Sequence, residues 1–246
     1  MPVVCTDGGN SLSRTTGTFL DYNSAYTAMA WILFTDFANA NGAVIWQQGG
    51  PSFALESLRA YNNGTNNIPM LWVNVTGFPL AAKTDGSTVL STGTWYHFAI
   101  VRTSTTLVTL YLNGVSEVTN ATDISARVAP DNALHGTQHN GTVAGLKTWN
   151  TALTVGQVQT EMARLRPAEA LGNLYEWLPE WTGSGERTRD YSGNGRDWAE
   201  VGTPADGDPP PVSYGAPVLW VNAPAAVVVP PPRYSWVPEL GPLLAQ

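Results

Sequence analysis

The feature that most constrains the fold is the segment LVTLYLNGVSEV, which reads as a strand, a tight turn and a second strand. Val108, Leu110 and Leu112 alternate with more polar neighbours, which is the two-residue period of a half-buried strand. Asn113-Gly114 then supplies the two positive-φ positions of a type I′ turn. The segment therefore predicts an antiparallel β-hairpin.

Short apolar runs of the same kind recur along the chain, with Gly, Asn and Pro between them. The run WYHFAIVR, just before the hairpin, is apolar on both faces, so we expect a central strand that is covered on both sides. Strands are predicted at Thr27–Thr35, Ala43–Gln47, Ser52–Leu58, Met70–Val75, Trp95–Thr103, Leu107–Leu112, Val143–Trp149, Leu174–Leu178 and Trp198–Val201. Many short strands separated by turn residues favour an all-β sandwich or barrel over a fold of alternating strands and helices.

One segment carries the signals of a helix. Thr154 suits an N-cap, and Gln157, three residues later, can complete a capping box. Apolar residues follow at helical spacing as far as Leu165, and Pro167 ends the run. We expect one short amphipathic helix that lies against the sandwich.

The C-terminal part of the chain has a different amino-acid composition. It is rich in proline, which favours extended polyproline geometry, and it carries large apolar side chains that are costly to expose to water. We therefore divide the chain into a sandwich domain, residues 1–207, and an extended proline-rich C-terminal arm, residues 208–246. The candidate assembly contacts on this arm are Trp220, Val228, Tyr234 and Trp236.

Charge and cysteine content bear on the class of partner. Lys and Arg number 12 against 19 Asp and Glu, which gives a net charge of −7. Nucleic-acid affinity comes largely from cationic contacts, so we expect no nucleic-acid partner. The single cysteine, Cys5, excludes an intrachain disulfide and fits a reducing cytoplasm. We see neither a signal peptide nor an apolar run of the roughly 20 residues that a membrane span needs, so we expect no membrane partner.

Three stretches together resemble laminin G-like domains of the concanavalin A-like lectin and glucanase group. TGTWYHFAIVRTSTTLVTLYLNGVSE resembles the central strand pair, VAGLKTWNTALTVGQVQTEM the passage from strand to helix, and LYEWLPEWTGSGERTRDYSGNGRDWAEVG the closing strands. The resemblance covers roughly residues 5–205. It implies a two-sheet antiparallel jelly-roll sandwich that serves adhesion or the binding of carbohydrate and protein.

Some members of that family hold a calcium ion near a rim, but the corresponding residues differ here. The strand before Trp149 usually carries acidic residues, whereas this chain has Ala-Gly-Leu at 144–146, and its Asp-Gly-Asp run at 206–208 lies in the linker. His135 and His139 have the spacing of a helical metal-binding pair, but the glycines around them favour a polar loop. We therefore expect no metal ion and no other cofactor.

Glucanases of the same superfamily cut polysaccharides with paired carboxylates, which lie about 5 Å apart in retaining enzymes. The Glu-x-Asp-x-Glu strand of those enzymes is absent from this sequence. The nearest pair is Glu176 and Glu180, and Pro179 breaks strand geometry between them. We expect a protein that is not an enzyme, with a glycoside hydrolase as the less favoured alternative.

Trp72 is the strongest candidate for contact with a sugar. It lies opposite its apolar neighbours in the alternation, on the same side as Asn74, and an aromatic platform with polar edges is what a sugar site needs. Asn66, in a polar loop, and Trp46 complete the candidate glycan-binding set. The alternative is that Trp72 packs under a loop or at a subunit contact.

These observations favour a non-catalytic structural or adhesion protein of a larger assembly, and among assemblies we favour a bacteriophage virion (head decoration, fibre or tail). In that hypothesis the chain forms a homo-oligomer, its arm contacts other virion or assembly proteins, and its sandwich binds a cell-surface glycan. Its location would be a virion assembled in the host cytoplasm, or otherwise the cytoplasm. A stand-alone carbohydrate-binding module is the alternative function.

Overall fold

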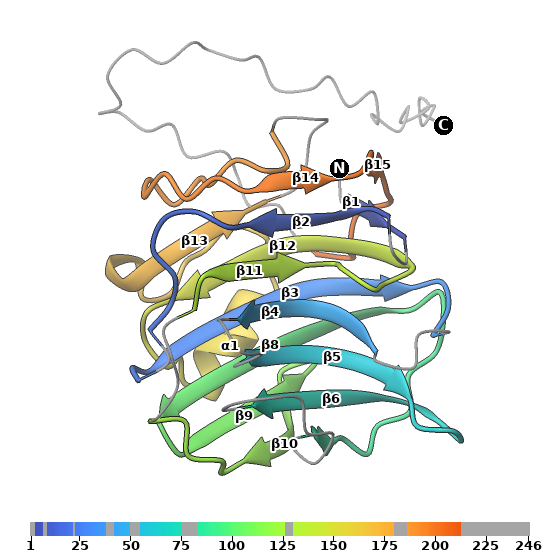
Figure 1. Ribbon diagram of the computed structural model, residues 1–246, viewed down its shortest axis with the longest axis horizontal. Coiled ribbons are helices and arrows are strands. Elements are labelled where there is room, and N and C mark those ends of the chain that lie inside the picture. The colour runs from blue at the N-terminus through green and yellow to red at the C-terminus, as the bar shows by residue number, and fades with distance from the viewer. Residues whose placement is uncertain are drawn as a thin grey trace, which may run out of the picture. The chain divides into compact units, whose positions relative to one another are not determined.

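The computed structural model describes residues 3–6, 9–21, 23–37, 42–49, 55–74, 83–125, 130–179 and 186–212. Within these ranges the chain forms strands β1 to β15 and the helix α1 (Figure 1). The strands are β1 (Val3–Cys5), β2 (Ser11–Arg14), β3 (Tyr26–Phe34), β4 (Ala43–Gly49), β5 (Leu55–Asn62), β6 (Asn67–Asn74), β7 (Lys83–Asp85), β8 (Trp95–Ser104), β9 (Leu107–Leu112), β10 (Val115–Asn120), β11 (Asn132–His135), β12 (Gly141–Trp149), β13 (Leu174–Leu178), β14 (Ala199–Val201) and β15 (Ala205–Asp206). The helix α1 spans Val155–Met162. From residue 213 onward the predicted arm, with Trp220, Val228, Tyr234 and Trp236, lies outside the described residues.

The strands form two antiparallel sheets, which confirms the predicted sandwich. The eight-stranded sheet has the order β10-β9-β8-β3-β12-β1-β15, and β13 also pairs with β12. The seven-stranded sheet has the order β14-β2-β11-β4-β5-β6-β7. In Figure 1 the seven-stranded sheet lies in front of the eight-stranded one, and strands that are distant in sequence, such as β3 and β12, lie side by side. This non-local pairing is that of a jelly roll.

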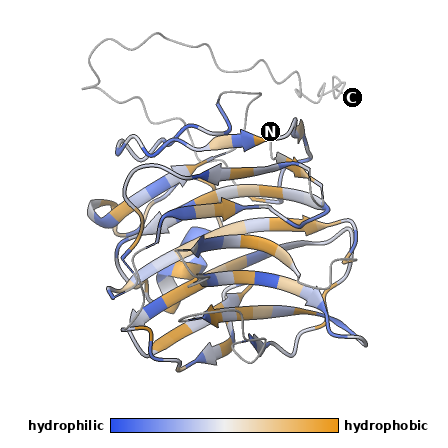
Figure 2. Cartoon of the chain, viewed as in Figure 1, coloured by the Kyte–Doolittle hydropathy of each residue, from blue (hydrophilic) through white to orange (hydrophobic). Residues whose placement is uncertain are grey.

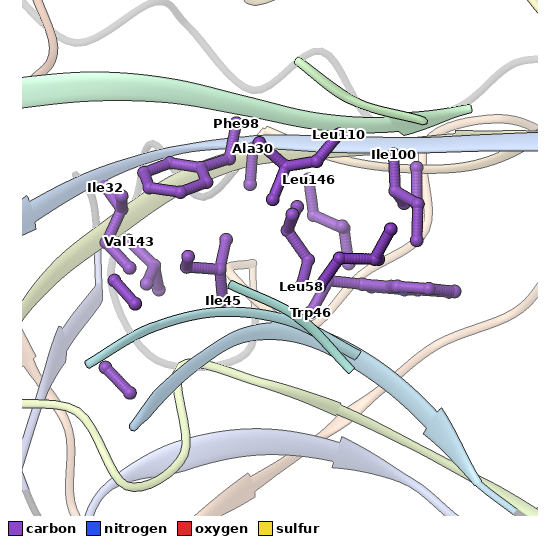
Figure 3. Packing of buried hydrophobic residues seen from close by; sticks show 14 of the residues in the cluster. Ala30, Ile32, Ile45, Trp46, Leu58, Phe98, Ile100, Leu110, Val143 and Leu146 are labelled. Atoms are coloured by element: carbon purple, nitrogen blue, oxygen red, sulfur yellow. The ribbon is translucent and has the colours of Figure 1, made fainter. Parts of the chain in front are cut away.

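The core lies between the two sheets. Ile32 of β3 and Phe98 of β8 meet Ile45 of β4 and Leu58 of β5, and all four side chains are fully buried (Figure 3). Hydrophobic and hydrophilic residues alternate along many strands (Figure 2), because successive side chains of a strand point to opposite faces. Each large apolar side chain buried in this way contributes about 1.5–3 kcal/mol.

Strand β8 is covered on both faces, as the run WYHFAIVR predicts. Phe98 and Ile100 face the core between the sheets. Ala99 and Val101 point the other way and pack in a second cluster that includes Val158 of α1. The helix therefore lies against the outer face of the eight-stranded sheet.

The hairpin and the helix cap also follow the sequence. Asn113 and Gly114 have φ values of 49° and 74°, so both turn positions are left-handed, and β9 pairs with β10. Thr154 caps α1, and its backbone N–H donates to the side chain of Gln157 at 2.9 Å, so the capping box is present. The helix ends at Met162, earlier than the apolar spacing suggests.

A buried lysine fastens α1 to the sheet. The Nζ atom of Lys147, in β12, donates to the Oε2 atom of Glu161 at 2.6 Å and to the carbonyl of Arg164 at 2.9 Å. The other carboxylate oxygen of Glu161 accepts the backbone N–H groups of Ala168 and Glu169. Burial lowers the pKa of Lys147 to about 8, although the charge of Glu161 acts in the opposite direction. The carboxylate thus holds both the lysine and the turn after the helix.

Candidate functional site

The outer face of the seven-stranded sheet carries polar, aromatic and cationic side chains. On β5, Leu58 and Ala60 belong to the core between the sheets. Ser57, Arg59 and Tyr61 alternate with them and therefore face outward. This strand thus presents a hydroxyl, a guanidinium and a phenol on the side away from the core.

Strands β6 and β7 add to the same face. Leu71 and Val73 face the core, and Trp72 points outward, as the alternation in the sequence predicts. In the register of the sheet, Trp72 lies opposite Ser57 of β5 and opposite Lys83 of β7. We call the resulting set the Arg59–Trp72 cluster: Gln47, Ser57, Arg59, Tyr61, Met70, Trp72, Asn74, Lys83, Asp85 and Gln138.

Trp72 is contacted by two cations. The guanidinium carbon of Arg59 and the Nζ atom of Lys83 each lie 4.7 Å from the centre of its ring. The same Nζ atom lies 5.2 Å from the ring centre of Tyr61. The negative face of an aromatic ring attracts cations at such distances, so the indole holds both charges in place.

Arg59 is 5% exposed, and uncharged oxygen atoms accept those of its hydrogen bonds that fall within the described residues. Its Nε atom donates to the hydroxyl of Ser57 at 2.8 Å, and its Nη atoms donate to the side-chain oxygens of Gln47 and Gln138. Burial lowers the pKa of Arg59 to about 10. Gln138 has a φ of 53°, a left-handed conformation that costs a non-glycine residue on the order of 1–3 kcal/mol and that is often found at functional sites.

The accessible edge of the cluster lies around Tyr61. The Tyr61 hydroxyl donates to the Oδ2 atom of Asp85 at 2.7 Å, and burial together with this bond raises the pKa of Tyr61 to about 12. Burial and the positive charge of Arg59 lower the pKa of Lys83, and Asp85 partly offsets them. Tyr61 and Lys83 are half-buried and Asp85 is exposed, so solvent reaches this edge.

The structure brings together two of the four predicted glycan-binding residues, Trp72 and Asn74. They share the outer face of β6, but they are 0% and 2% exposed, so their contact with a sugar stays a prediction. Asn66 is exposed at the tip of the β5–β6 hairpin. It is six residues from Trp72, roughly 20 Å away at about 3.3 Å per residue, so it is not part of the cluster.

Trp46 was expected at the glycan site, and this expectation is wrong. The ring is 1% exposed and packs in the core between the sheets (Figure 3). The cause is a register shift between Val44 and Trp46 where β4 pairs with β5. Because the strand bulges there, Ile45 and Trp46 both face the core although they are adjacent in sequence.

Sequence reasoning missed Arg59 and Lys83. The predicted strand Ser52–Leu58 ends one residue before Arg59, whereas β5 continues to Asn62. The alternation in LRAY, with Leu and Ala on one side and Arg and Tyr on the other, was the available signal. For Lys83 no local signal existed, because only the register of β7 against β6 brings it to Trp72.

Glu176, the candidate acid of a glycosidase, is an internal structural group. It is buried, its Oε1 atom lies 2.6 Å from Nη2 of Arg14, and its Oε2 atom accepts the Thr148 hydroxyl at 3.2 Å. Burial raises the pKa of Glu176 to about 7. Its predicted partner Glu180 lies outside the described residues. The ion pair joins β13 of one sheet to β2 of the other.

The described residues do not fit a metal site. Among them, no group of three or more His, Cys, Asp or Glu side chains is arranged to hold a metal ion. Ala144, on the strand where the resemblance led us to look for acidic ligands, is fully buried in an apolar cluster. His135 lies in β11 and not in a loop, and both it and His139 are fully buried. In the same part of the chain, no helix has the length and hydrophobicity that crossing a membrane requires.

Two antiparallel sheets in this order define a jelly-roll β-sandwich. The chain belongs to the concanavalin A-like lectin/glucanases superfamily, because a laminin G-type model of that superfamily matches residues 7–159. This match confirms the laminin G-like resemblance in the sequence. No curated protein matches the sequence.

Two solved structures share the fold. One is a protein from Bacteroides ovatus that is provisionally assigned to carbohydrate binding, with 16% identity, a TM-score of 0.59, and coverage of 87% of this chain and 62% of that one. The present chain thus spans less than two thirds of that protein. The other is the CBM40 module of the Ruminococcus gnavus IT-sialidase, with 13% identity, a TM-score of 0.51, and coverage of 66% of this chain and 97% of that one.

Proposed function

We propose that the sandwich is a non-catalytic carbohydrate-binding domain whose ligand contacts the Arg59–Trp72 cluster. The cluster itself is the observation that carries the proposal. Sugar sites combine an aromatic surface with hydrogen-bonding groups at its edge, and the half-buried Tyr61, Gln47 and Lys83 offer both on one sheet face. Trp72 then acts from beneath, where its ring orients the two cations.

The two solved structures of the same fold support this proposal, since one is provisionally assigned to carbohydrate binding and the other is a carbohydrate-binding module of a sialidase. The surroundings of Glu176 support the non-catalytic part. A general acid must reach the glycosidic oxygen, whereas the Glu176 carboxyl is buried against Arg14 between the sheets.

A glycan array tests the proposal with the full chain and two matched variants. Tyr61→Ala removes the accessible aromatic ring of the cluster, so we expect the signal of bound glycans to fall at least severalfold. Tyr191→Ala is the control, because Tyr191 is also a partly exposed tyrosine but packs against Trp177 far along the chain from the cluster. Circular dichroism would show that both variants fold. The proposal fails if the wild-type chain binds no glycan, or if both variants weaken binding equally.

We also propose that the chain is a structural or adhesion component of a larger assembly, with a phage virion as the favoured one. The proline-rich, apolar sequence of the arm supports this role, because side chains such as Trp220 and Trp236 would gain from burial against a sister subunit or another protein. Removing residues 213–246 tests it and keeps Val212, which packs against a cluster of the sandwich. We expect a smaller oligomer by light scattering and loss of incorporation into the native particle. An unchanged oligomer and unchanged incorporation would refute the role.

A further inference from the structure

The charge of the Arg59–Trp72 cluster is opposite to that of the whole chain. The chain has a net charge of −7 and only 12 basic residues. Two of these, Arg59 and Lys83, lie on one indole ring, and the cluster contains one acidic residue, Asp85. Its formal charge is therefore +2 − 1 = +1. A local positive charge on an acidic protein concentrates anions at that place.

The two cations repel each other. The positive charge of Arg59 is among the causes that lower the pKa of Lys83, after burial itself. Since both charges lie 4.7 Å from the same ring centre, they are at most 9.4 Å apart. The screening length at physiological salt is about 8 Å, and charges that are partly buried are screened less than exposed ones. The cluster thus holds two like charges close to one ring.

Within the described part of the chain, the hydrogen bonds of Arg59 position the guanidinium more than they neutralise it. Ser57, Gln47 and Gln138 accept these bonds with uncharged oxygens, and Gln138 does so from a strained backbone conformation. A buried cation has a desolvation cost that neutral acceptors offset only in part. An anionic group would reduce both this cost and the repulsion from Lys83, whereas an uncharged sugar would offset the cost only in part and would leave the repulsion unchanged.

We propose, resting on the carbohydrate-binding function above, that the Arg59–Trp72 cluster selects acidic saccharides and attracts their anionic group to Arg59 and Lys83. A carboxylate and a sulfate share the chemistry that the cluster recognises, namely negatively charged oxygens that accept hydrogen bonds from cations. Tyr61 and Gln47 then contact the uncharged part of the sugar.

Isothermal titration calorimetry on the full chain tests this selectivity with paired probes. Oligogalacturonate is compared with its methyl ester, which lacks the charge, and dextran sulfate is compared with dextran. We expect at least one anionic probe to bind about tenfold more tightly than its neutral partner, in the range of a hydrogen bond to a charged group. The first pair reports a carboxylate and the second a sulfate.

Lys83→Gln is the informative variant, because Lys83 is half-buried and its loss does not leave a buried charge behind. We expect this variant to lose most of the preference, and Lys83→Arg to restore it. Arg189→Gln is the control, since Arg189 is an exposed cation that lies 5.3 Å from the ring centre of Tyr191, outside the cluster. High salt should reduce the wild-type preference.

Equal binding of charged and neutral probes, or a preference unchanged in Lys83→Gln, would overturn the selectivity and leave the carbohydrate-binding function intact. Binding of no glycan at all, on the array or in calorimetry, would overturn both. Loss of the preference in Arg189→Gln as well as in Lys83→Gln would also overturn the assignment to this cluster, because it would reflect the charge of the whole protein.

Discussion

The ion pair between Glu56 and Arg102 links the two sheets through the core. Glu56 lies in β5 and Arg102 in β8, and both side chains are 0% exposed. The Nη2 atom of Arg102 donates to Oε2 of Glu56 at 2.7 Å, its Nε atom donates to the same oxygen at 3.0 Å, and its Nη1 atom donates to the carbonyl of Ser104 at 2.8 Å. Desolvation is the largest single cause and would lower the pKa of Arg102, but the charges and hydrogen bonds of Glu56 and Tyr26 together outweigh it, and the pKa is raised.

Arg102→Met removes the cation and retains most of the unbranched stem, so the main effect is a carboxylate left in the core without its cationic partner. Breaking a buried pair in this way costs about 3–5 kcal/mol. At about 2–4 °C per kcal/mol for a domain of this size, the melting temperature should fall by about 6–20 °C. Removing both charges in Glu56→Leu/Arg102→Met should recover much of this loss, because well-packed apolar residues often replace a buried pair at little cost.

Urea denaturation followed by tryptophan fluorescence measures these free energies of unfolding. The control is Arg189→Met, which removes an exposed cation and should change stability by less than about 0.5 kcal/mol. The reasoning is refuted if Arg102→Met costs less than about 1 kcal/mol, or if the costs of the two single variants simply add in the double variant.

Three further predictions concern other parts of the sandwich. Burial raises the pKa of Glu176 from 4.5 to about 7, so the stability that its protonated form contributes is complete below pH 4.5 and is lost as the pH rises through 7. In urea denaturation, Glu176→Gln should therefore flatten the dependence of the free energy of unfolding on pH. An unchanged pH profile in this variant would contradict the prediction. Thr154→Ala removes the N-cap of α1 and should lower the free energy of unfolding by about 1 kcal/mol, as measured by thermal unfolding. An unchanged stability would argue against the capping box. Gly141→Ala places a Cβ atom 1.9 Å from the carbonyl oxygen of Leu33, so circular dichroism should show that this variant does not fold. Gly172→Ala is the control, because Gly172 has open space around it and the variant should fold.

The parts of the fold that the sequence predicted are those with local signals. A two-residue turn such as Asn113-Gly114 and a capping box at Thr154 are encoded within a few residues, so no tertiary information is needed. Strands β1, β2, β7, β11 and β15 were not predicted, since each is two to four residues long and too short to display an alternation. Their pairing with distant partners, such as β1 with β12, makes them strands.

The candidate site shows the same division between local and tertiary information. The outward direction of Trp72 follows from its strand alone, and it was predicted correctly. The side chain of Trp46 points into the core because of a bulge that no residue pattern predicts. The placement of Arg59 and Lys83 next to Trp72 depends on the register of three strands. Sequence reasoning could therefore name the aromatic residue but not the charges around it.

The outer faces of the two sheets differ in a way that bears on function. On β8, outward residues such as Ala99 and Val101 are apolar, because α1 and its flanking turns cover them. On β5, the outward residues Ser57, Arg59 and Tyr61 are polar or amphipathic, which would be a poor surface for a helix to cover. A continuous apolar run in one strand and an alternating run in another thus distinguish a face that packs against apolar groups from a face that carries hydrogen-bonding and charged groups. By this criterion, the glycan-binding surface that we propose lies on the seven-stranded sheet.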